Sequence, residues 1–591
     1  MVEVAGSAAV EDRETLIAQL ARSFKERVPE QEAAAITDLA RVFLAHFPLE
    51  DWAGRPYNDI LGGFRSLWAQ LQTQRDQFPV VRVFNPTLDE HGWLCGRTVI
   101  IVLQKDMPFL VDSIRLEFNR RDIPIHTVKS NVLYVGRDAT GCPRAVYGGG
   151  DKPDPTGNLE FHKEALLYME ISLHSSESEL VELRKAVQEV LDDVALVVDD
   201  FAAMLHCVEQ LMQNLARTQV VATAKDQADD HQEGNHQEGN HQEGYDQAQE
   251  VQDFLQWLMD SHFTFLGYRE YDFVGGKEQP VLQENVDARR GVFRKLGNKP
   301  VEVREADFSL GMAAFYHSDD TIAFSKAANR SQIHRSVYPD YVVVKRYDKR
   351  GKVCGEARIL GLFTYSVYSL TPTEIPLIRA KVARVIERSG LDPYSYDGKN
   401  LRRVIENYPR DELFQAPFDE LYDNIMGVAS INERRVVRLL MRKDPFGNFV
   451  TALVYVPREI YTTEIRIKIE KLIGEAIHSQ ELDSTTYFSE STLARAQMVF
   501  RVDSENEVKY DLHKLEAGIL AITRNWRDQL EHAFVDHLGE GPGLKQFRLY
   551  RNAFSSDYQE SFDPRTAVQD VAMLGAIGDP KYDNDPKAKV R

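Results

Sequence analysis

The stretch TVIIVLQKDMPFLVDSIRLEFNRRDIPIHTVKSNVLYVGRD, residues 98–138, decides the fold of the first part of this chain. Thr98 to Leu103 is an almost unbroken run of apolar and β-branched residues, which predicts a short buried strand. The residues that follow predict a helix with Pro108 in its first turn, ended by Asp122 and Pro124. The apolar face of this helix is formed by residues spaced four apart, namely Leu110, Ile114 and Phe118.

The same kind of pattern continues beyond this stretch. Val128 to Val135 and Glu164 to Leu173 predict strands, and Val194 to Val198 predicts one more, short strand. Ser176 and Glu179 have the spacing of a capping box ahead of an amphipathic helix. With the first strand and helix, the order is βαββαβ. We therefore expect a four-stranded antiparallel sheet with two helices on one face, the ferredoxin-like arrangement.

These residues also carry a family resemblance. The segment DMPFLVDS, residues 106–113, resembles the first ACT-type domain of the large bacterial NAD-specific glutamate dehydrogenases. Four later stretches resemble the same family, in order: DFLQWLMDSHFTFLGYREY from Asp253, SVYPDYVVVKRYD from Ser336, ARILGLFTYSVYS from Ala357 and YPRDELFQ from Tyr408. The resemblance implies a PAS-type domain in the middle of the chain and a second ACT-type domain after it.

The fold class we expect is therefore α+β and multidomain, with ferredoxin-like (ACT-type) units, a PAS-type mixed α/β region and flanking helices. The expected regions are a helical one at 1–78, a first ACT-like domain with an exit helix at 79–219, a linker at 220–250, a PAS-type region at 251–430, a second ACT-like domain at 431–540, and the start of a next module with a disordered tail at 541–591. In the last ACT-like region the predicted order is ββαββα, a cyclic shift of the first unit. Its final helix is predicted to run from Leu512 past Trp526 to Leu530.

Composition limits the possible partners and compartment. At 591 residues the chain is too long for one core, and its net charge of −20 argues against a nucleic-acid partner or an anionic membrane surface. No apolar run is long enough to span a bilayer. The four scattered cysteines form no CxxC pair, which excludes a cysteine zinc site and fits a cytoplasmic location. They are Cys95, Cys142, Cys207 and Cys354.

The repeat HQEGNHQEGNHQEG lies in the predicted linker. It is polar and punctuated by glycine, so it has nothing to bury and is typical of a mobile spacer. Its histidines, His231, His236 and His241, raise the alternative of a metal site. Metal sites usually need preorganised ligands with supporting contacts, so we expect a spacer and no metal.

The best candidate site is the loop that joins the first strand to its helix, Gln104 to Asp112. The resemblance implies that an ACT-type loop binds an amino-acid effector, and free N–H groups at a helix start bind a carboxylate. The residues concerned are Asp106, Met107, Pro108, Phe109, Leu110 and Asp112. Many ACT loops carry glycine where this chain has Phe109, and a ring there would fill the space for a ligand. Effector binding and a purely structural role both stay open.

Other polar groups are expected to be structural. Asp192/Asp193 and Asp199/Asp200 flank the predicted strand 194–198, where neighbouring side chains face opposite ways, so we expect a solvated edge rather than an acid/base pair. The histidines in or beside the first unit's strands are expected to be hydrogen-bonded sheet residues and not ligands. They are His126, His162 and His174.

No catalytic machinery is recognisable in the chain. The dinucleotide fingerprint GxGxxG after a strand is missing, as are GxxxxGK[ST], HExxH and GxSxG. The resemblance implies that NAD is the cofactor of the intact enzyme and that the catalytic domain lies beyond this chain, which then looks like an N-terminal piece without catalytic, cofactor or metal residues of its own. The leading interpretation is the regulatory and assembly part of an NAD-dependent glutamate dehydrogenase. The alternative is a stand-alone amino-acid-sensing or scaffold protein.

The expected assembly is a homo-oligomer. Val132 and Tyr134 alternate with Leu133 and Val135, so both faces of this strand are apolar. A sheet covered by helices on one face only would leave an apolar face for a contact, either with a neighbouring domain or with a second subunit. The resemblance favours the subunit contact.

Overall fold

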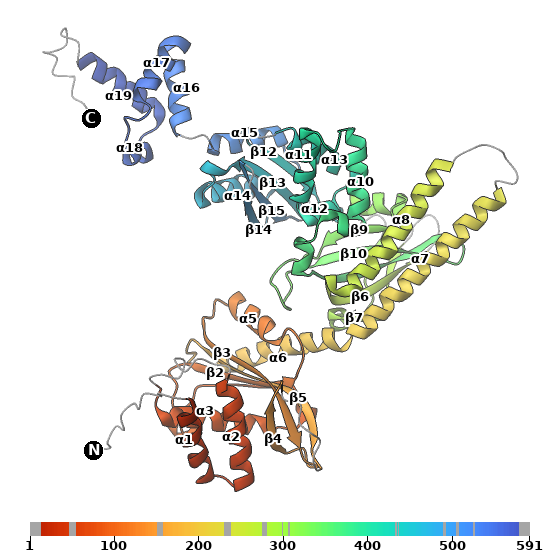
Figure 1. The fold of residues 1–591 in the computed structure, drawn as a ribbon, viewed down its shortest axis with the longest axis vertical. Helices are drawn as coiled ribbons and strands as arrows, with labels where there is room; N and C mark the ends of the chain where they lie inside the picture. The colour runs from red at the N-terminus through yellow and green to blue at the C-terminus, as the bar shows by residue number, and fades with distance from the viewer. Residues whose placement is uncertain are drawn as a thin grey trace. The chain divides into compact units, whose positions relative to one another are not determined.

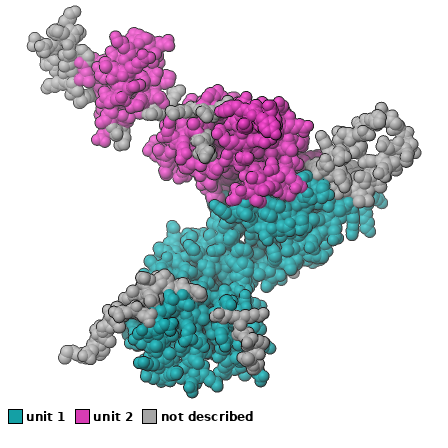
Figure 2. Space-filling view, viewed as in Figure 1, with its two compact units in different colours: residues 1–306, 321–367 teal, residues 307–320, 368–591 magenta. Residues whose placement is uncertain are grey.

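The computed structural model describes residues 13–45, 55–150, 158–229, 238–274, 281–297, 299–304, 308–431, 434, 436–488, 492–503, 508–523 and 526–577. The chain divides into two compact units, which Figure 2 shows in different colours. Unit 1 comprises Met1–Ala306 and Thr321–Val367, and unit 2 comprises Asp307–Asp320 and Tyr368–Arg591. The short segment 307–320 thus belongs to unit 2 although the chain on both sides of it belongs to unit 1.

Unit 1 begins with three amphipathic helices, in agreement with the helical region predicted there. They are α1 Arg13–Lys25, α2 Glu30–Ala45 and α3 Tyr57–Leu71 (Figure 1). Each helix buries one apolar stripe, which includes Leu20, Phe43 and Phe64, all at most 1% exposed. These stripes belong to the same hydrophobic cluster as strand residues such as Leu133 and Leu166. The three helices therefore share a core with the sheet that follows.

The first sheet has five antiparallel strands in the order β1-β2-β5-β3-β4. The strands are β1 Val80–Phe84, β2 Thr98–Lys105, β3 Ile125–Arg137, β4 Pro143–Gly148 and β5 Glu160–Ile171. The helices are α4 Leu88–His91, α5 Leu110–Arg120 and α6 Glu177–Asp199. The predicted strands at 98–103, 128–135 and 164–173 and the predicted helix after Pro108 are confirmed. Pro108 itself precedes the helix, because Phe109 is the N-cap residue.

The predicted strand Val194 to Val198 is wrong: these residues continue α6 to Asp199. Val190, Val194 and Val197 are buried at helical spacing, so the packing of one helix face outweighs the β-preference of valine. The edge position beside β2 is taken instead by β1, which pairs antiparallel with it from Val80 opposite Leu103 to Phe84 opposite Val99. The real order, with the β3–β4 hairpin counted as one strand position, is ββαββα.

The capping box predicted at the start of α6 is absent, because the Ser176 hydroxyl contacts Ser178 instead.

Both faces of the first sheet are covered by helices of the same unit. Leu133 and Val135 are fully buried in the cluster that contains α1, α2 and α3. Helices α5 and α6 contact each other and the sheet, α5 through β3 and α6 through β1. Of the two contacts expected for an apolar face of this sheet, the structure shows the one with a neighbouring region of the chain, the N-terminal helices. The expected homo-oligomer stays a prediction.

Two long helices follow: α7 Phe201–Asp229 and α8 Glu238–Trp257, the latter followed by the π-turn η3 Leu258–His262. Both helices extend into the segment 220–250 for which a linker is predicted. His231 and His236 lie outside the described residues, and of His241 only its place in α8 is described. The metal alternative for the three histidines stays untested.

The middle sheet contains six antiparallel strands in the order β8-β7-β6-β11-β10-β9. They are β6 Phe263–Val274, β7 Val281–Gly291, β8 Glu302–Arg304, β9 Ile322–Lys326, β10 Asp340–Tyr347 and β11 Val353–Phe363, with the 3-10 turns η4 Val292–Leu296 and η6 Tyr365–Tyr368. The sequence pattern predicts strands at 263–273, 321–326, 341–347 and 353–363, which correspond to β6, β9, β10 and β11. It does not predict β7 and β8.

Unit 2 contains a helical layer and a third sheet. The helices before the sheet are α9 Leu310–His317, η7 Pro372–Glu374, α10 Ile378–Ser389, α11 Tyr396–Glu406, α12 Arg410–Gln415 and α13 Phe418–Ala429. The sheet has the order β12-β13-β15-β14, and its elements are β12 Arg438–Lys443, β13 Phe449–Pro457, η8 Arg458–Ile460, α14 Thr463–Ile477, β14 Glu481–Phe488, β15 Leu493–Arg501 and α15 Leu512–Thr523. The predicted order ββαββα is confirmed. A turn joins β12 to β13, where Gly447 N–H donates to the Asp444 carbonyl.

The third sheet repeats the plan of the first. Its order is also ββαββα, and β12, β13, β15 and β14 correspond to β1, β2, β5 and β3. The cyclic shift predicted between the two units does not exist, since it arose from the mistaken strand at 194–198 and from overlooking β1.

The chain described ends in four helices, α16 Trp526–Leu538, α17 Glu540–Tyr550, α18 Ser556–Ser561 and α19 Pro564–Ile577. Leu530 and Phe534 pack with Ala567 and Val568 in a cluster of their own, whereas Leu515 belongs to the core of the third sheet. The apolar residues predicted to form one helix face therefore serve two separate cores. Within the described residues, no helix is both long and apolar enough to cross a membrane.

Candidate functional site

The predicted effector loop joins β2 to α5 and has an unusual backbone. Phe109 has φ +72°, a left-handed conformation that non-glycine residues seldom adopt. Its side chain is half-buried and makes no cap hydrogen bond. The backbone at this position thus has the conformation that favours glycine, so Phe109 carries strain of order 1 kcal/mol here.

The start of α5 is contacted by a residue far along the chain, His334. Its backbone N–H donates to Ser113 Oγ at 3.2 Å, and its Nδ1 lies 3.2 Å from Asp112 Oδ2. Its ring lies 4.9 Å from the Phe109 ring, centroid to centroid. His334 also has a positive φ of +66°. Two strained residues therefore meet at this helix start, and the contact fills part of the predicted loop site.

The six predicted residues have three different surroundings. Phe109 and Asp112 face His334, and Leu110 is buried in the core. Asp106 and Pro108 are exposed and Met107 is half-buried. No local pattern in the sequence could have revealed His334, which lies more than 200 residues away from the loop.

A buried ion cluster lies on the other face of the same sheet. Glu170 on β5 accepts two hydrogen bonds from Arg55, at 2.6 and 2.9 Å, one from Arg97 at 3.0 Å and one from the Tyr168 hydroxyl at 2.7 Å. Burial raises the pKa of Glu170, but the hydrogen bonds from Arg55 and Tyr168 outweigh burial and hold that pKa below its usual value. The cluster ties the segment before α3 to the sheet. A lone glutamate in the apolar run LLYMEISL is a signal for such a buried partner.

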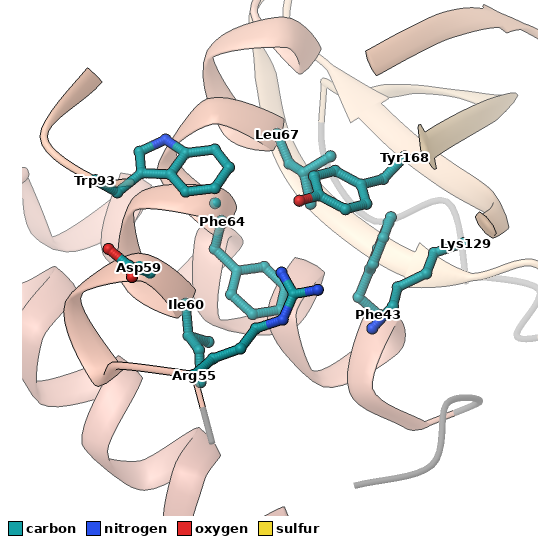
Figure 3. A pocket seen from close by; sticks show the side chains of 10 residues that line it. Phe43, Arg55, Asp59, Ile60, Phe64, Leu67, Trp93, Lys129 and Tyr168 are labelled. Carbon is teal, nitrogen blue, oxygen red and sulfur yellow. The ribbon is translucent and has the colours of Figure 1, made fainter. Parts of the chain in front are cut away.

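Figure 3 shows a pocket beside this cluster. Its wall is formed by α2, α3 and the first sheet, with Phe64 at its base and Arg55, Asp59 and Tyr168 around it. The pocket is narrow, with room for about one water molecule. Arg55 and Tyr168 already donate to Glu170, so this arrangement holds the helical layer on the sheet rather than offering an open ligand site.

The carboxylate pairs 192/193 and 199/200 do not form a solvated strand edge. Asp193 pairs with Lys295, and Asp200 accepts hydrogen bonds from Gly291 N at 2.8 Å and from Arg294 at 3.0 Å. Asp193 and Asp200 are seven residues apart, which is two helical turns, so they face the same way toward η4 and its flanks. Burial raises the pKa of Asp193. Asp193 and Asp200 therefore fasten α6 to the middle sheet, whereas Asp192 and Asp199 are exposed.

The histidines of the first sheet are hydrogen-bonded or paired as predicted. His126 contacts the Ser172 hydroxyl at 3.2 Å, His174 contacts the Ser172 carbonyl at 2.7 Å, and His162 lies 3.5 Å from Glu160. Within the described residues no group of three or more His, Cys, Asp or Glu side chains could hold a metal ion. All four cysteines are free thiols.

The geometry defines the class: a multidomain protein with two ββαββα units, each combined with helices. Four family models match this chain in succession: the glutamate dehydrogenase ACT1 domain at residues 39–187, helical motif 1 at 375–434, the ACT2 domain at 438–527 and helical motif 2 at 533–577. The ACT1 model begins within α2 and includes all of α3. The second ACT model covers the third sheet with α14 and α15.

Curated proteins show similarity to the same family. The NAD-specific glutamate dehydrogenase of Halomonas elongata is 36% identical over 567 residues, which is 96% of this chain and 34% of that protein. The corresponding proteins of Pseudomonas aeruginosa and Mycobacterium tuberculosis are 35% and 24% identical and cover 95% and 91% of this chain. The chain spans about a third of the length of these relatives. Over almost its whole length, it is homologous to the ACT and helical-motif region of the large NAD-specific glutamate dehydrogenases.

Proposed function

We propose that this chain is the regulatory and assembly portion of an NAD-dependent glutamate dehydrogenase, acting in amino-acid catabolism in the cytoplasm. The intact enzyme would convert L-glutamate, NAD⁺ and water to 2-oxoglutarate, NADH and ammonium, with NAD bound outside this chain. The observation that carries the proposal is the succession of four glutamate dehydrogenase modules, ACT1, helical motif 1, ACT2 and helical motif 2, along one chain.

The middle sheet is proposed to be a PAS-type domain. Counted in chain order without the short β8, its strands lie in the order 2-1-5-4-3, all antiparallel. This order, with helix α8 leading into β6, is the one that a PAS-type sheet has. In the regulatory proposal the domain connects the ACT1 sheet, through α6 and α7, to the rest of the chain.

The regulatory role is proposed to use an amino-acid effector at the β2–α5 loop, with the chain in a homo-oligomer. The free N–H groups at the start of α5 provide the attraction for a carboxylate. Phe109 and His334 stand in the way, and Asp112 is in contact with His334. An effector would therefore have to displace His334, which would link effector binding to the middle sheet.

The enzymatic half of the proposal is tested by assaying the purified chain for glutamate-dependent NADH formation at 340 nm. We expect no turnover, since no dinucleotide fingerprint is present in the sequence. Turnover well above a heat-killed control would contradict the proposal.

The effector half is tested by calorimetry with the proteinogenic amino acids on the wild-type chain and on His334→Ala. We expect at least one amino acid to bind, and to bind more tightly to the variant, because the competing contact is removed. The matched control is His317→Ala, which leaves the loop unchanged. Absence of binding to both chains would leave the loop a purely structural element and contradict the effector role.

A further inference from the structure

Buried and half-buried arginines of the described residues are paired, with few exceptions, to carboxylates. The pairs are Arg55 with Glu170, Arg137 with Glu164, Arg289 with Glu284, Arg346 with Glu270, Arg358 with Glu356 and Arg442 with Glu412. Arg410 and Arg495 in unit 2 differ. Within the residues that the structure describes, neither forms an ion pair, although Arg410 feels the more distant charge of Glu406.

The two arginines converge on the turn between α11 and α12. Arg410 donates to the Tyr408 carbonyl at 2.8 Å and to the Leu370 carbonyl at 2.9 Å. Arg495, which projects from β15, donates to the Asn407 carbonyl and stacks over the Tyr487 ring with its guanidinium carbon 4.8 Å from the centroid. The side-chain Nε of each arginine is buried without a hydrogen-bond partner among the described residues.

Two unneutralised cations at this place are electrostatically unfavourable. Burial lowers the pKa of Arg410, and the charge of Arg495 lowers it further. Burial also lowers the pKa of Arg495. Backbone carbonyls accept hydrogen bonds from these guanidinium groups, but they carry no full charge to balance two positive ones. An oxyanion would supply that charge, and arginine forks match the geometry of carboxylate and phosphate oxygens.

We propose that Arg410 and Arg495 form a binding site for a small oxyanion, a carboxylate or a phosphate, between β15 and helical motif 1. Tyr487, whose side chain is 43% exposed and whose hydroxyl donates to Asn407 Oδ1 at 3.1 Å, stands at the solvent side of this site. The site belongs to unit 2 alone and shares no residue with the β2–α5 loop. It adds an anion-responsive element to helical motif 1 and ACT2 and does not depend on the effector proposal for ACT1.

The experiment measures the thermal unfolding of the whole chain with inorganic phosphate or succinate, at ionic strength held constant with chloride. Both probes carry the proposed chemistry, and the two arms distinguish phosphate from carboxylate. The variants are Arg410→Gln, Arg495→Gln and Arg495→Lys. The matched control is Arg402→Gln, because Arg402 lies on α11 in the same helical motif and is exposed.

We expect at least one probe to raise the unfolding midpoint of the wild type and of the control by ~3 °C. This rise should level off as the anion concentration increases. The two glutamine variants should show no such rise, and Arg495→Lys should need about tenfold more anion, because lysine keeps the charge but loses the fork. Without added anion, Arg410→Gln should unfold at the same temperature as the wild type or higher, because a like-charge repulsion is removed.

Three outcomes would overturn the proposal. The first is a wild-type midpoint that no probe changes. The second is an equal rise in the wild type, the control and the glutamine variants, which would be a general salt effect. The third is an Arg410→Gln variant that unfolds at a lower temperature than the wild type without anion and responds to anion as the wild type does. The arginines would then serve only as hydrogen-bond donors to backbone carbonyls. Should Arg495→Gln fail to fold, Arg410→Gln and Arg495→Lys still decide between these results.

Discussion

The ACT1 and ACT2 domains have the same order of strands and helices, but their second sheet faces are covered differently. In ACT1 the cover is α1 to α3, which pack through a large apolar cluster that includes Phe43, Phe64 and Trp93. In ACT2 it is helical motif 1, whose α12 meets the sheet through Glu412, bound to Arg442 on β12 at 2.7 and 2.8 Å. The ACT1 cover thus includes a large apolar cluster, and the ACT2 cover includes a deeply buried ion pair.

The comparison also shows that the carboxylate of the ion pair can come either from the sheet or from the helices that cover it. In ACT1 the sheet supplies the carboxylate of Glu170 and the helical side supplies Arg55. In ACT2 the sheet supplies Arg442 and the helical side supplies Glu412. What the two domains share is therefore the requirement that the second face be covered, and not a particular set of residues. This requirement explains why neither sheet presents a broad apolar face.

Among changes to the polar contacts of the two covers, the largest effect is expected from breaking the ACT2 contact with Glu412→Ala. Arg442 is only 5% exposed, so its charge would stay buried with Gln415 Oε1 as its remaining side-chain partner. Removing one member of such a pair costs about 3–5 kcal/mol of unfolding free energy. Urea denaturation measures the loss of unfolding free energy. Hydrogen exchange should show reduced protection of the amides in residues 375–501 and unchanged protection in ACT1. An unchanged ACT2 would show that the ion pair does not hold the helical layer.

The matching change in ACT1, Glu170→Gln, should cost less, about 1–3 kcal/mol. Glu170 is as deeply buried as Glu412, but its partners reach solvent: the side chains of Arg55 and Arg97 are 27% and 40% exposed. Water can therefore solvate the arginines once the carboxylate is gone, and the apolar cluster remains. The same denaturation experiment measures this value. A cost equal to that of Glu412→Ala would remove the distinction between an apolar and a charged cover.

A third prediction concerns pH, because the ACT2 cover contains a lysine whose pKa is lowered. Lys381 on α10 donates to the carbonyls of Leu413, Phe414 and Ala416 at 3.2, 2.8 and 3.0 Å. Burial, with a smaller contribution from Arg442, lowers its pKa from 10.5 to about 8. Below pH 8 both the folded and the unfolded chain hold the proton, and between pH 8 and 10.5 only the unfolded chain does.

The free energy of unfolding contributed by Lys381 should therefore rise as the pH increases through 8 toward 10. We expect a rise of ~1–2 kcal/mol relative to Lys381→Met, since the three carbonyl acceptors favour the ammonium and offset part of the effect of burial. Urea denaturation of both chains at pH 7, 8.5 and 9.5 measures the difference. A difference that does not change with pH, or falls, would contradict the prediction.

The sequence predicted most of the strands and helices because their apolar spacing is strong, and it failed where local preference and packing disagree. Val194 to Val198 is rich in valine, so local propensity favours a strand, yet the residues continue the buried face of α6. The short run Val80 to Phe84 carries too few residues to identify β1. These two errors together produced the wrong strand order for ACT1 and the supposed shift against ACT2.

The candidate site was predicted only as far as its local residues. The position of Phe109 and the helix start follow from the sequence, but the contact with His334 depends on the tertiary fold. The same is true of Arg410 and Arg495, which are 85 residues apart in the sequence and meet at one turn only because helical motif 1 covers the ACT2 sheet. A pattern in the sequence can locate a loop, but not the distant side chain that fills it.

The smallest effect is expected from Tyr134→Glu on β3 of ACT1. Tyr134 is half-buried, and its ring lies 5.4 Å from the ammonium of Lys163, to which the new carboxylate could pair. The unfolding free energy should change by no more than about 0.5–1 kcal/mol, whereas Val135→Glu, at a fully buried position of the shared cluster, should prevent folding. Because the Tyr134 ring already packs against Lys163 of the same sheet, light scattering should give the same mass for Tyr134→Glu and the wild type. Dissociation of an oligomer by this change would place Tyr134 at a subunit contact and show that the helical cover does not replace one.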